Sequence, residues 1–521
     1  MLRKCAAVIA ALFMSNVPIW ADPVTLVANG GGLTVMGDVL GYDGKFIRVD
    51  TEFGELTLDF EEVTCTGDDC PDPDQFVPAL SFAGAHRIGD LLLPSLVEAY
   101  ARQSGLSFLR TESGASQFSY VLADAVTEQE KLRLTFRLSN TDEGFADLLA
   151  NEADVVMAVR EVRPTERNLA RDIGLGDLTD TGRSRIVALD GLVPIVSPGQ
   201  TVKSIALADL DRAFSGEISN WSELGGRDAP INLYLRDVNS GLAQGFEDRV
   251  LGPSDASLSS GAIRLDNDQA LSDAVFSDSN ALGVTAFESI GDAEPLGLTG
   301  PCGLTVTADR TRLRTEDYPL TIPLFLYLPQ RRLPDAAMAF LNYVRSPEAQ
   351  RVVRRAGFVD QAGVPTAIKG QGDRLATAIL NAGEEVPLTE LQRMMRVLGK
   401  LERLSMTFRF EVGSTRLDAQ SRSNAARMAR DLRAGVHRDQ RLIFVGFSDA
   451  RGPASENRKL SSARAEAVQR RVNVALGETE LSDFTLETEA FGEALPMACD
   501  DTEWGRQVNR RVEVWVGPRL E

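Results

Sequence analysis

The 521-residue chain has only two histidines, His86 and His437, far apart in the sequence. It lacks the H-E-x-x-H and paired C-x-x-C spacings that hold zinc. The G-x-S-x-G turn of hydrolases and the phosphate loop of nucleotide hydrolases are also missing. These absences predict that the protein is not an enzyme, with no catalytic residues, no metal site and no cofactor.

Long hydrophobic runs are scarce too. Arg3 and Lys4 precede the apolar stretch AAVIAALFM, and Ala21 offers a small residue for cleavage. Residues 1–21 are therefore predicted to be a secretory signal peptide. No later stretch is long and apolar enough to cross a bilayer, so we expect an exported protein without a transmembrane segment after cleavage.

Basic residues are outnumbered, with 55 Lys and Arg against 75 Asp and Glu, a net charge of −20. Loss of the two basic residues of the signal peptide would make this −22. Residues 401–521 contain 19 basic and 19 acidic residues, so the acidic excess lies before residue 401. Such a surface argues against nucleic acid and anionic membranes as partners.

Cysteine is also rare, and four residues remain after the signal peptide: Cys65, Cys70, Cys302 and Cys499. Export permits disulfides. The stretch CTGDDC closes a short loop, which predicts a Cys65–Cys70 disulfide. Cys302 and Cys499 either pair across domains or stay free, and the sequence leaves both possibilities open.

The hydrophobic pattern divides the chain into four parts. Residues 22–72 alternate apolar and polar residues between turn signals, which indicates a small β domain. Strand and helix patterns alternate over residues 79–365, which is typical of an α/β domain with parallel strands. Residues 366–403 are predicted to be a helical connector, and residues 404–521 follow an α+β pattern. The fold class is therefore mixed, with α/β and α+β domains.

The C-terminal part contains the stretch GFSDARGPASENRKLSSARAEAV, in which Asp449 follows an apolar strand and Arg464 lies in a helical pattern. An ordered motif runs through this helix: Asn457, Leu460, Ser461, Arg464 and Ala465. With FGE near residue 491 and NRRVEVW at 509–515, it closely resembles the peptidoglycan-binding C-terminal domain of the OmpA family. The resemblance covers about 115 residues.

This resemblance implies a site for the diaminopimelate of the cell-wall peptide. Asp449 would bind its ammonium group and Arg464 its carboxylate through charge-assisted hydrogen bonds. It also implies that the pocket is completed by further residues: Ser448, Asn457 and one arginine of Arg510 and Arg511. The family's usual Gly-His-Thr-Asp is Gly-Phe-Ser-Asp here, so a hydroxyl is kept. The alternative is that Asp449 and Arg464 form only an internal ion pair.

The middle part contains FSG at 214–216, NWS at 220–222, and Arg236 shortly before Ser240 and Gly241. These motifs resemble the phosphate-binding proteins of ABC transporters over about 290 residues. The resemblance implies the type II periplasmic-binding architecture, with two α/β lobes and an anion in the cleft between them.

Carried onto this sequence, the resemblance implies these anion-binding candidates: Ala85, His86, Arg87, Ser139, Asn140, Thr141, Arg160, Arg236, Ser240 and Gly241. Several hydroxyls of the family pattern are lost: Val159 and Leu242 stand in two of their places, and the family's first loop, often Gly-Ser-x-Thr, is GAHRIG here, which gains His86 and Arg87. The ligand could therefore be phosphate or another small anion. The alternative is a retained scaffold that binds no small molecule.

Together these patterns predict a solute-binding protein of the periplasm of a Gram-negative-type envelope, associated non-covalently with the cell wall and outer membrane. Its expected ligands are peptidoglycan and a small anion. The alternative is an envelope structural or interaction protein whose two-lobed domain binds a protein partner.

Overall fold

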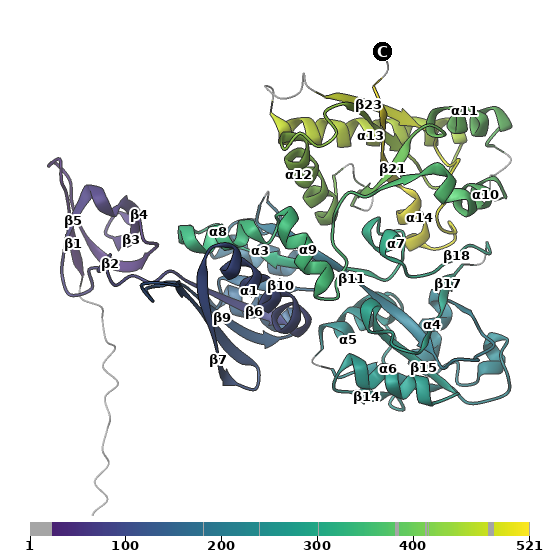
Figure 1. Cartoon of the computed structure of the whole chain (residues 1–521), viewed down its shortest axis with the longest axis horizontal. Coiled ribbons are helices and arrows are strands. Elements are labelled where there is room, and N and C mark those ends of the chain that lie inside the picture. The colour runs from purple at the N-terminus through teal and green to yellow at the C-terminus, as the bar shows by residue number, and fades with distance from the viewer. Residues whose placement is uncertain are drawn as a thin grey trace, which may run out of the picture. The chain divides into compact units, whose positions relative to one another are not determined.

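A computed structural model describes residues 23–180, 182–238, 240–300, 302–380, 385–411, 414, 416–477 and 484–519, without the side chains of residues 373 and 377. The predicted signal peptide lies outside these residues. The chain forms two compact units, one comprising the N-terminal part up to Pro78 with Arg332–Met338, and one comprising the remainder (Figure 1).

The first unit is an antiparallel sheet in the order β4-β3-β2-β1-β5. Its strands are β1 (Val24–Ala28), β2 (Thr34–Tyr42), β3 (Phe46–Thr51), β4 (Gly54–Asp59) and β5 (Val63–Thr66). Asp43 fixes the β2–β3 turn, because its carboxylate accepts hydrogen bonds from the amides of Lys45 and Phe46 at 2.9 and 2.7 Å. The predicted disulfide Cys65–Cys70 is confirmed and joins β5 to the following loop.

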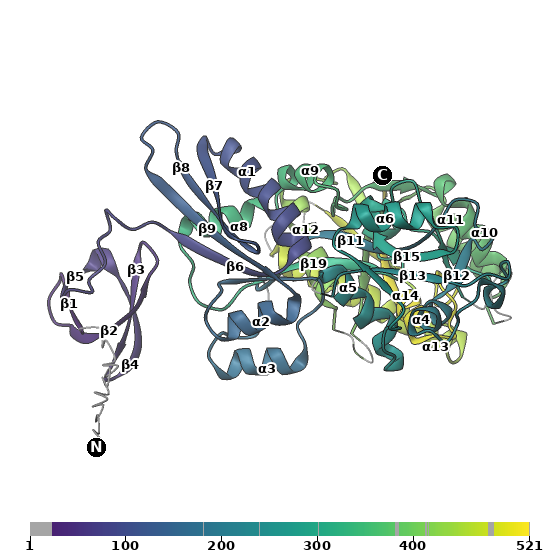
Figure 2. The ribbon, with the colours of Figure 1, turned by 90° about the horizontal axis from the view of Figure 1, so that it is seen from below.

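The second unit begins with a two-lobed domain whose sheet follows the order β14-β13-β15-β11-β19-β10-β6-β9-β8-β7. The two central strands, β11 (Ser184–Val196) and β19 (Thr321–Tyr327), are antiparallel and stand between the lobes (Figure 2). Almost every residue of β11 is buried, which explains why its sequence is mostly apolar.

The first lobe contains β6 (Ala79–Ala85), β7 (Leu106–Gly114), β8 (Gln117–Asp124), β9 (Glu130–Ser139), β10 (Val155–Ala158), α1 (Leu93–Gln103), α2 (Thr141–Leu149) and α3 (Pro164–Asp172). The second lobe contains β12 (Ser204–Ala206), β13 (Asn232–Arg236), β14 (Ile263–Leu265), β15 (Ala281–Ala286), α4 (Leu207–Ser215), α5 (Gly241–Phe246), α6 (Asp268–Ser277) and α7 (Arg310–Arg314). Parallel pairing, as predicted, joins β10, β6 and β9 and also β14, β13 and β15. The antiparallel β7, β8, β11 and β19 make the sheet mixed.

The C-terminal domain is built on a five-stranded sheet in the order β20-β21-β24-β22-β23. Its strands are β20 (Pro365–Ala367), β21 (Glu402–Arg409), β22 (Gln440–Gly446), β23 (Thr485–Ala490) and β24 (Arg511–Pro518). Successive residues of a strand point to opposite faces. Leu442 and Phe444 accordingly pack with α12 (Ala419–Arg433) and α13 (Ala454–Leu476).

Ile443 and Val445 point to the other face of this sheet, where they pack with α11 (Leu388–Leu398). The segment predicted as a connector, residues 366–403, therefore contributes two helices to a layer of the C-terminal domain, α10 (Gly372–Leu380) and α11. The end of β22 lies so close to α13 that only glycine fits at position 446: a Cβ there would lie 2.0 Å from the carbonyl oxygen of Ser461. Within the described ranges no helix is long and apolar enough to cross a membrane.

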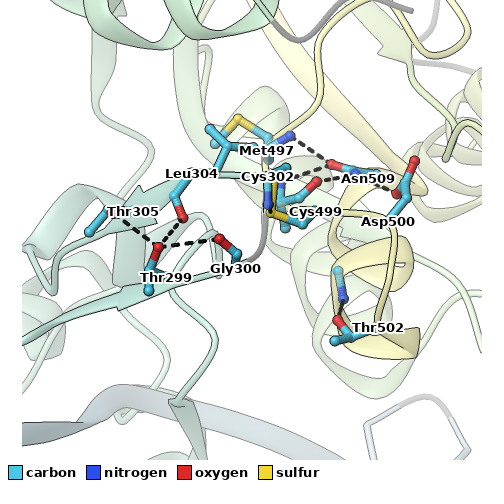
Figure 3. Close-up of a disulfide and its surroundings, with 12 residues drawn as sticks. Thr299, Gly300, Cys302, Leu304, Thr305, Met497, Cys499, Asp500, Thr502 and Asn509 are labelled. Carbon is cyan, nitrogen blue, oxygen red and sulfur yellow. Dashed lines mark hydrogen bonds between the residues drawn. A yellow bond between two sulfur atoms is a disulfide. The ribbon is translucent and has the colours of Figure 1, made fainter. Parts of the chain in front are cut away.

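Two features join the two-lobed domain to the C-terminal domain. Cys302 and Cys499 form a disulfide, which decides the pairing that the sequence leaves open (Figure 3). Asp317, which follows α7, is buried and accepts hydrogen bonds from Arg403 and Arg409 of β21 at 2.9 and 3.2 Å. A covalent bond and a buried ion cluster thus connect the domains.

Candidate functional sites

The first candidate site lies where β22 ends. The chain is fixed there by two backbone hydrogen bonds, from Phe447 to the carbonyl of Arg511 at 2.8 Å and from Ser448 to that of Gly492 at 2.9 Å. These bonds hold Asp449, which is 9% exposed, at the edge of the sheet beside the start of α13.

Asp449 is paired with Arg510. The Nη1 atom of Arg510 donates to Oδ2 of Asp449 at 2.9 Å, and its Nη2 donates to Glu503 at 2.5 Å. Burial opposes the charge of Arg510, but the hydrogen bonds to Glu503 and Asp449 outweigh it and raise the pKa of this guanidinium. The resulting arrangement is a half-buried chain of alternating charges at the mouth of the site.

Arg464 lies on α13 and is half-buried, with its guanidinium 5.6 Å from the centre of the Phe410 ring. It has no ion pair with any residue in the described ranges. Burial lowers its pKa, and neighbouring Arg510 lowers it further, while Asp449 opposes both effects. Arg464 is therefore electrostatically close to Asp449 and remains available to an external anion.

The remaining predicted residues of this site divide into two groups. Asn457 is buried in the first turn of α13 and donates to Oε2 of Glu493 at 2.5 Å, and Ser448 has a buried hydroxyl without a hydrogen-bond partner in the described part of the chain. Arg511, by contrast, is fully buried and pairs with Glu513 at 2.7 Å. Of the two arginines, Arg510 is thus the one at the site.

Three carboxylates beside this site were not predicted from the sequence. Glu385 accepts from the amide of Ala454 at 2.8 Å, and Asp500 from that of Ala450 at 2.7 Å. Burial raises the pKa of the third, Glu493, its hydrogen bond from Asn457 lowers it, and Glu385, Asp500 and Asp449 raise it further. The acidic surroundings favour a cationic group next to Asp449. Of the three, Glu493 could have been predicted from the sequence, because it is the glutamate of the FGE motif.

The second candidate site is a cavity of about 580 Å³ in the two-lobed domain. His86 and Arg87 follow β6 of the first lobe, whereas Arg236 and Ser240 come from β13 and the start of α5 in the second. The structure therefore brings five of the ten predicted anion-binding candidates to one cavity: His86, Arg87, Arg236, Ser240 and Gly241.

Both arginines of this cavity are bound to aspartates. Arg87 pairs with Asp190 and, at 2.7 Å, with Asp268, and Arg236 pairs with the other oxygen of Asp268. Burial opposes the charge of Arg87, but Asp190 and Asp268 outweigh it and raise its pKa. Asp268 thus bridges an arginine of each lobe, and an incoming anion would compete with it.

The polar residues around the cavity have local roles. The hydroxyl of Ser240 accepts from the amide of Ala243 at 3.0 Å and caps α5, which Gly241 begins. Burial lowers the pKa of His86, Asp90 raises it, and Arg236 lowers it. A largely neutral His86 can donate one hydrogen bond and accept another.

The other predicted anion-binding residues do not line this cavity. Ala85 is buried at the end of β6, the Ser139 hydroxyl donates to the carbonyl of Asn140 at 3.3 Å, and the Asn140 side chain caps α2. Thr141 is buried, and its amide donates to Gln244 of α5 at 3.1 Å, which links the two lobes. Arg160 pairs with Asp142 and, at 2.6 Å, with Glu166.

Sequence reasoning emphasised the arginines of the cleft and missed its aspartates. The described lining contains two arginines and four aspartates: Asp90, Asp237, Asp266 and Asp268. Three of these aspartates lie in short acidic stretches that the sequence shows, LRD at 235–237 and LDND at 265–268. Within the described ranges, no group of three or more His, Cys, Asp or Glu residues could hold a metal ion.

Comparison with known proteins finds relatives of both domains. Residues 101–348 match the family model of the PBP superfamily domain, and residues 409–510 match the OmpA family. The phosphate-binding protein PstS of Bacillus subtilis (strain 168) is 28% identical over 34% of this chain and 56% of its own length. The chain therefore spans a little over half of that relative.

The C-terminal part is similar to the peptidoglycan-associated lipoprotein of Pseudomonas putida, with 35% identity over 21% of this chain and 61% of that protein. The solved structure of an ABC-type phosphate transport receptor from Vibrio cholerae is also similar. The alignment spans 54% of this chain and 99% of the receptor chain, with 16% identity and a TM-score of 0.42. By these family models, the chain is similar to the PBP superfamily in its middle part and to the OmpA family in its C-terminal part.

Proposed function

We propose that this is a binding protein of the periplasm that attaches non-covalently to the cell wall through its OmpA-family domain. The similarity to a peptidoglycan-associated lipoprotein supports this assignment. The main observation in its favour is which charged and polar groups of the site already have partners within the protein. Asp449 is held in place by Arg510, while Arg464 and the buried hydroxyl of Ser448 have no ion pair and no hydrogen bond, respectively, with described residues.

The diaminopimelate of a cell-wall peptide carries an ammonium and a carboxylate on one carbon, and this geometry suits the site. The ammonium would bind Asp449, in surroundings made more acidic by Glu493 and Asp500. The carboxylate would bind Arg464 and accept a hydrogen bond from Ser448. Hydrogen bonds to charged groups contribute about 1.5–3 kcal/mol each, so loss of Arg464 should weaken binding at least about tenfold.

The test is co-sedimentation of the mature protein with purified peptidoglycan that contains diaminopimelate. We expect Asp449→Ala and Arg464→Ala to stay in the supernatant at concentrations at which the wild type pellets. Arg470→Ala is the matched control, because Arg470 lies on the same helix but is 65% exposed and 3.6 Å from Glu466. Sedimentation of Arg464→Ala equal to that of this control would refute the proposed site.

A second proposed function is the binding of phosphate or another small anion in the two-lobed domain. The observation that favours it is the convergence of His86, Arg87, Arg236 and Ser240 on one cavity. Attachment to the wall would then keep this site at a high local concentration in the envelope. No catalytic step is part of the proposal, in line with the two binding-protein families that the chain matches.

Isothermal titration with phosphate, sulfate and small dicarboxylates tests the cleft, with Arg236→Gln as the loss-of-binding variant. Arg212→Gln is the control, because Arg212 is half exposed on α4 of the same lobe. If no anion binds to the wild type, solute binding is wrong. The two-lobed domain would then serve as an interaction module for another envelope protein, the alternative that the sequence already offers.

A further inference from the structure

A second large cavity, of about 750 Å³, lies where the two-lobed domain meets the C-terminal domain. One wall consists of residues 304–306 and 309–312, and the other includes Thr366 and residues 369–372. Leu304 and Met497, which also line it, flank the disulfide between Cys302 and Cys499 (Figure 3). The cavity shares no lining residue with the cleft, and none with the residues of the wall-binding site.

The lining of this junction cavity is basic, although the chain as a whole carries a charge of −20. Two acidic residues line it, Asp309 and Asp317. The described lining also contains five basic residues: Arg310, Arg312, Lys369, Arg374 and Arg403. A concave surface with an excess of one charge raises the local concentration of ions of the opposite charge.

Two basic side chains of the lining, Lys369 and Arg312, have hydrogen-bonding capacity to spare. Lys369 is exposed and has no ion pair in the described part of the chain. Arg312 binds the hydroxyl of Thr307 at 2.5 Å and lies 3.2 Å from Asp309 within one helical turn. These two groups come from opposite walls, so an anion between them could bind both.

Behind the lining, buried arginines outnumber the carboxylates that they contact. Glu513 accepts from Arg374 and from Arg511, the latter at 2.7 Å, and lies 3.3 Å from Nε of Arg403. Asp317 is the second carboxylate of the cluster and also pairs with Arg409. A third carboxylate, that of Glu316, lies 3.9 Å from Arg409, so four arginines share three carboxylates.

The excess charge has two visible consequences. Burial, together with the nearby charges of Arg403 and Arg511, lowers the pKa of Arg374 to about 9 against the opposing effects of Glu513 and Asp317. Nε of Arg403 is buried and has no hydrogen-bond partner in the described part of the chain. A buried charge without sufficient counter-charge is costly, and a bound anion would remove that cost.

We propose that the junction cavity is a binding site for a small anion with two or more carboxylate or phosphate groups. Lys369 and Arg312 would bind its outer charges, and Arg374 would face its inner end. The volume falls in the range of about 300–1,000 Å³ that is typical of small-molecule sites. Because both domains supply walls, the ligand would also strengthen their association.

The test is isothermal titration of the mature protein with citrate and with pyrophosphate at constant ionic strength, with acetate as the monovalent reference. The double variant Lys369→Gln/Arg312→Gln removes one charge from each wall without touching the buried cluster. We expect the wild type to bind at least one of the two multivalent anions more tightly than acetate, and the double variant to bind it at least about tenfold more weakly.

Arg351→Gln/Arg212→Gln is the control for loss of two charges, because both side chains are at least half exposed, at 59% and 50%. It should bind like the wild type, as should the cleft variant Arg236→Gln. Thermal unfolding of each variant confirms that it is folded. Equal binding by the two double variants, loss of binding in Arg236→Gln, or no multivalent anion bound more tightly than acetate would each overturn the proposal.

Discussion

The buried ion cluster makes a strong prediction about how the two domains hold together. Asp317 is 1% exposed and accepts hydrogen bonds from Arg403, Arg409 and the hydroxyl of Thr315, the last at 2.8 Å. Asp317→Asn keeps the size of the side chain but removes its charge. Two buried guanidinium groups then lose a counter-charge that Glu513 cannot replace, because it is already shared.

Removing one partner of a buried ion pair typically costs about 3–5 kcal/mol. The asparagine oxygen can still accept one of the two arginine hydrogen bonds, so we expect Asp317→Asn to lower the free energy of unfolding by about 3 kcal/mol. The wild-type contribution also has a pH dependence. Burial would raise the pKa of Asp317, but Arg403 and Arg409 hold it well below its ordinary value. The stabilisation is therefore full above about pH 4 and is lost as the pH falls below that.

Urea unfolding at pH 7 and at lower pH measures this effect. Trp515 is a useful fluorescent probe, because its indole nitrogen donates to Glu513 of the same cluster at 3.1 Å. Glu466→Gln is the matched control: Glu466 is 49% exposed and pairs with Arg470, so its loss should cost less than about 1 kcal/mol. A free energy of unfolding for Asp317→Asn within 1 kcal/mol of this control at pH 7 would show that the cluster does not stabilise the junction.

Three further results are expected. Because the disulfide between Cys302 and Cys499 closes a loop of 197 residues, Cys302→Ser/Cys499→Ser should lose about 4–5 kcal/mol of stability, measurable by urea unfolding against the oxidised wild type. Asp268→Asn should raise the affinity of the cleft for phosphate or sulfate in isothermal titration, because a neutral side chain competes less well for Arg236. Burial raises the pKa of Glu316 to about 8. The contribution of this group to stability is therefore complete below about pH 4.5 and is lost as the pH rises to 8. Glu316→Gln should melt at a higher temperature than the wild type at pH 8 but not at pH 4.

Local patterns were sufficient to place Asp449 and Arg464, the two ends of the proposed wall-binding site. The apolar run before Asp449 forms β22, and the helical pattern around Arg464 forms α13, as expected. Local patterns could not predict which of Arg510 and Arg511 lies at the site. Adjacent residues point in opposite directions where a strand begins, but which one enters the core depends on the position of β24 between β21 and β22.

The cleft shows the same limit over a longer range. Of the three arginines expected in the cleft, Arg87 and Arg236 line one cavity, whereas Arg160 does not. Their partners could not be inferred, because Asp190 and Asp268 lie 103 and 181 residues from Arg87 in the sequence. Only the folded sheet brings these carboxylates to the arginines, and they change the expected chemistry from a simple basic cleft to one in which an anion must compete for its donors.

The segment after the two-lobed domain matters most for the proposed attachment. Its amphipathic pattern predicted helices, yet the surface that their apolar side covers is the second face of the C-terminal sheet. Strand β20 begins at Pro365, only ten residues after α9 (Pro347–Arg355) ends, so little chain is left to act as a free linker. The disulfide and the buried cluster also join the domains. If the C-terminal domain binds the cell wall as proposed, it would therefore hold the two-lobed domain directly and not through a flexible tether. A ligand in the junction cavity would then bind this joined arrangement, and its affinity should depend on both domains being in place.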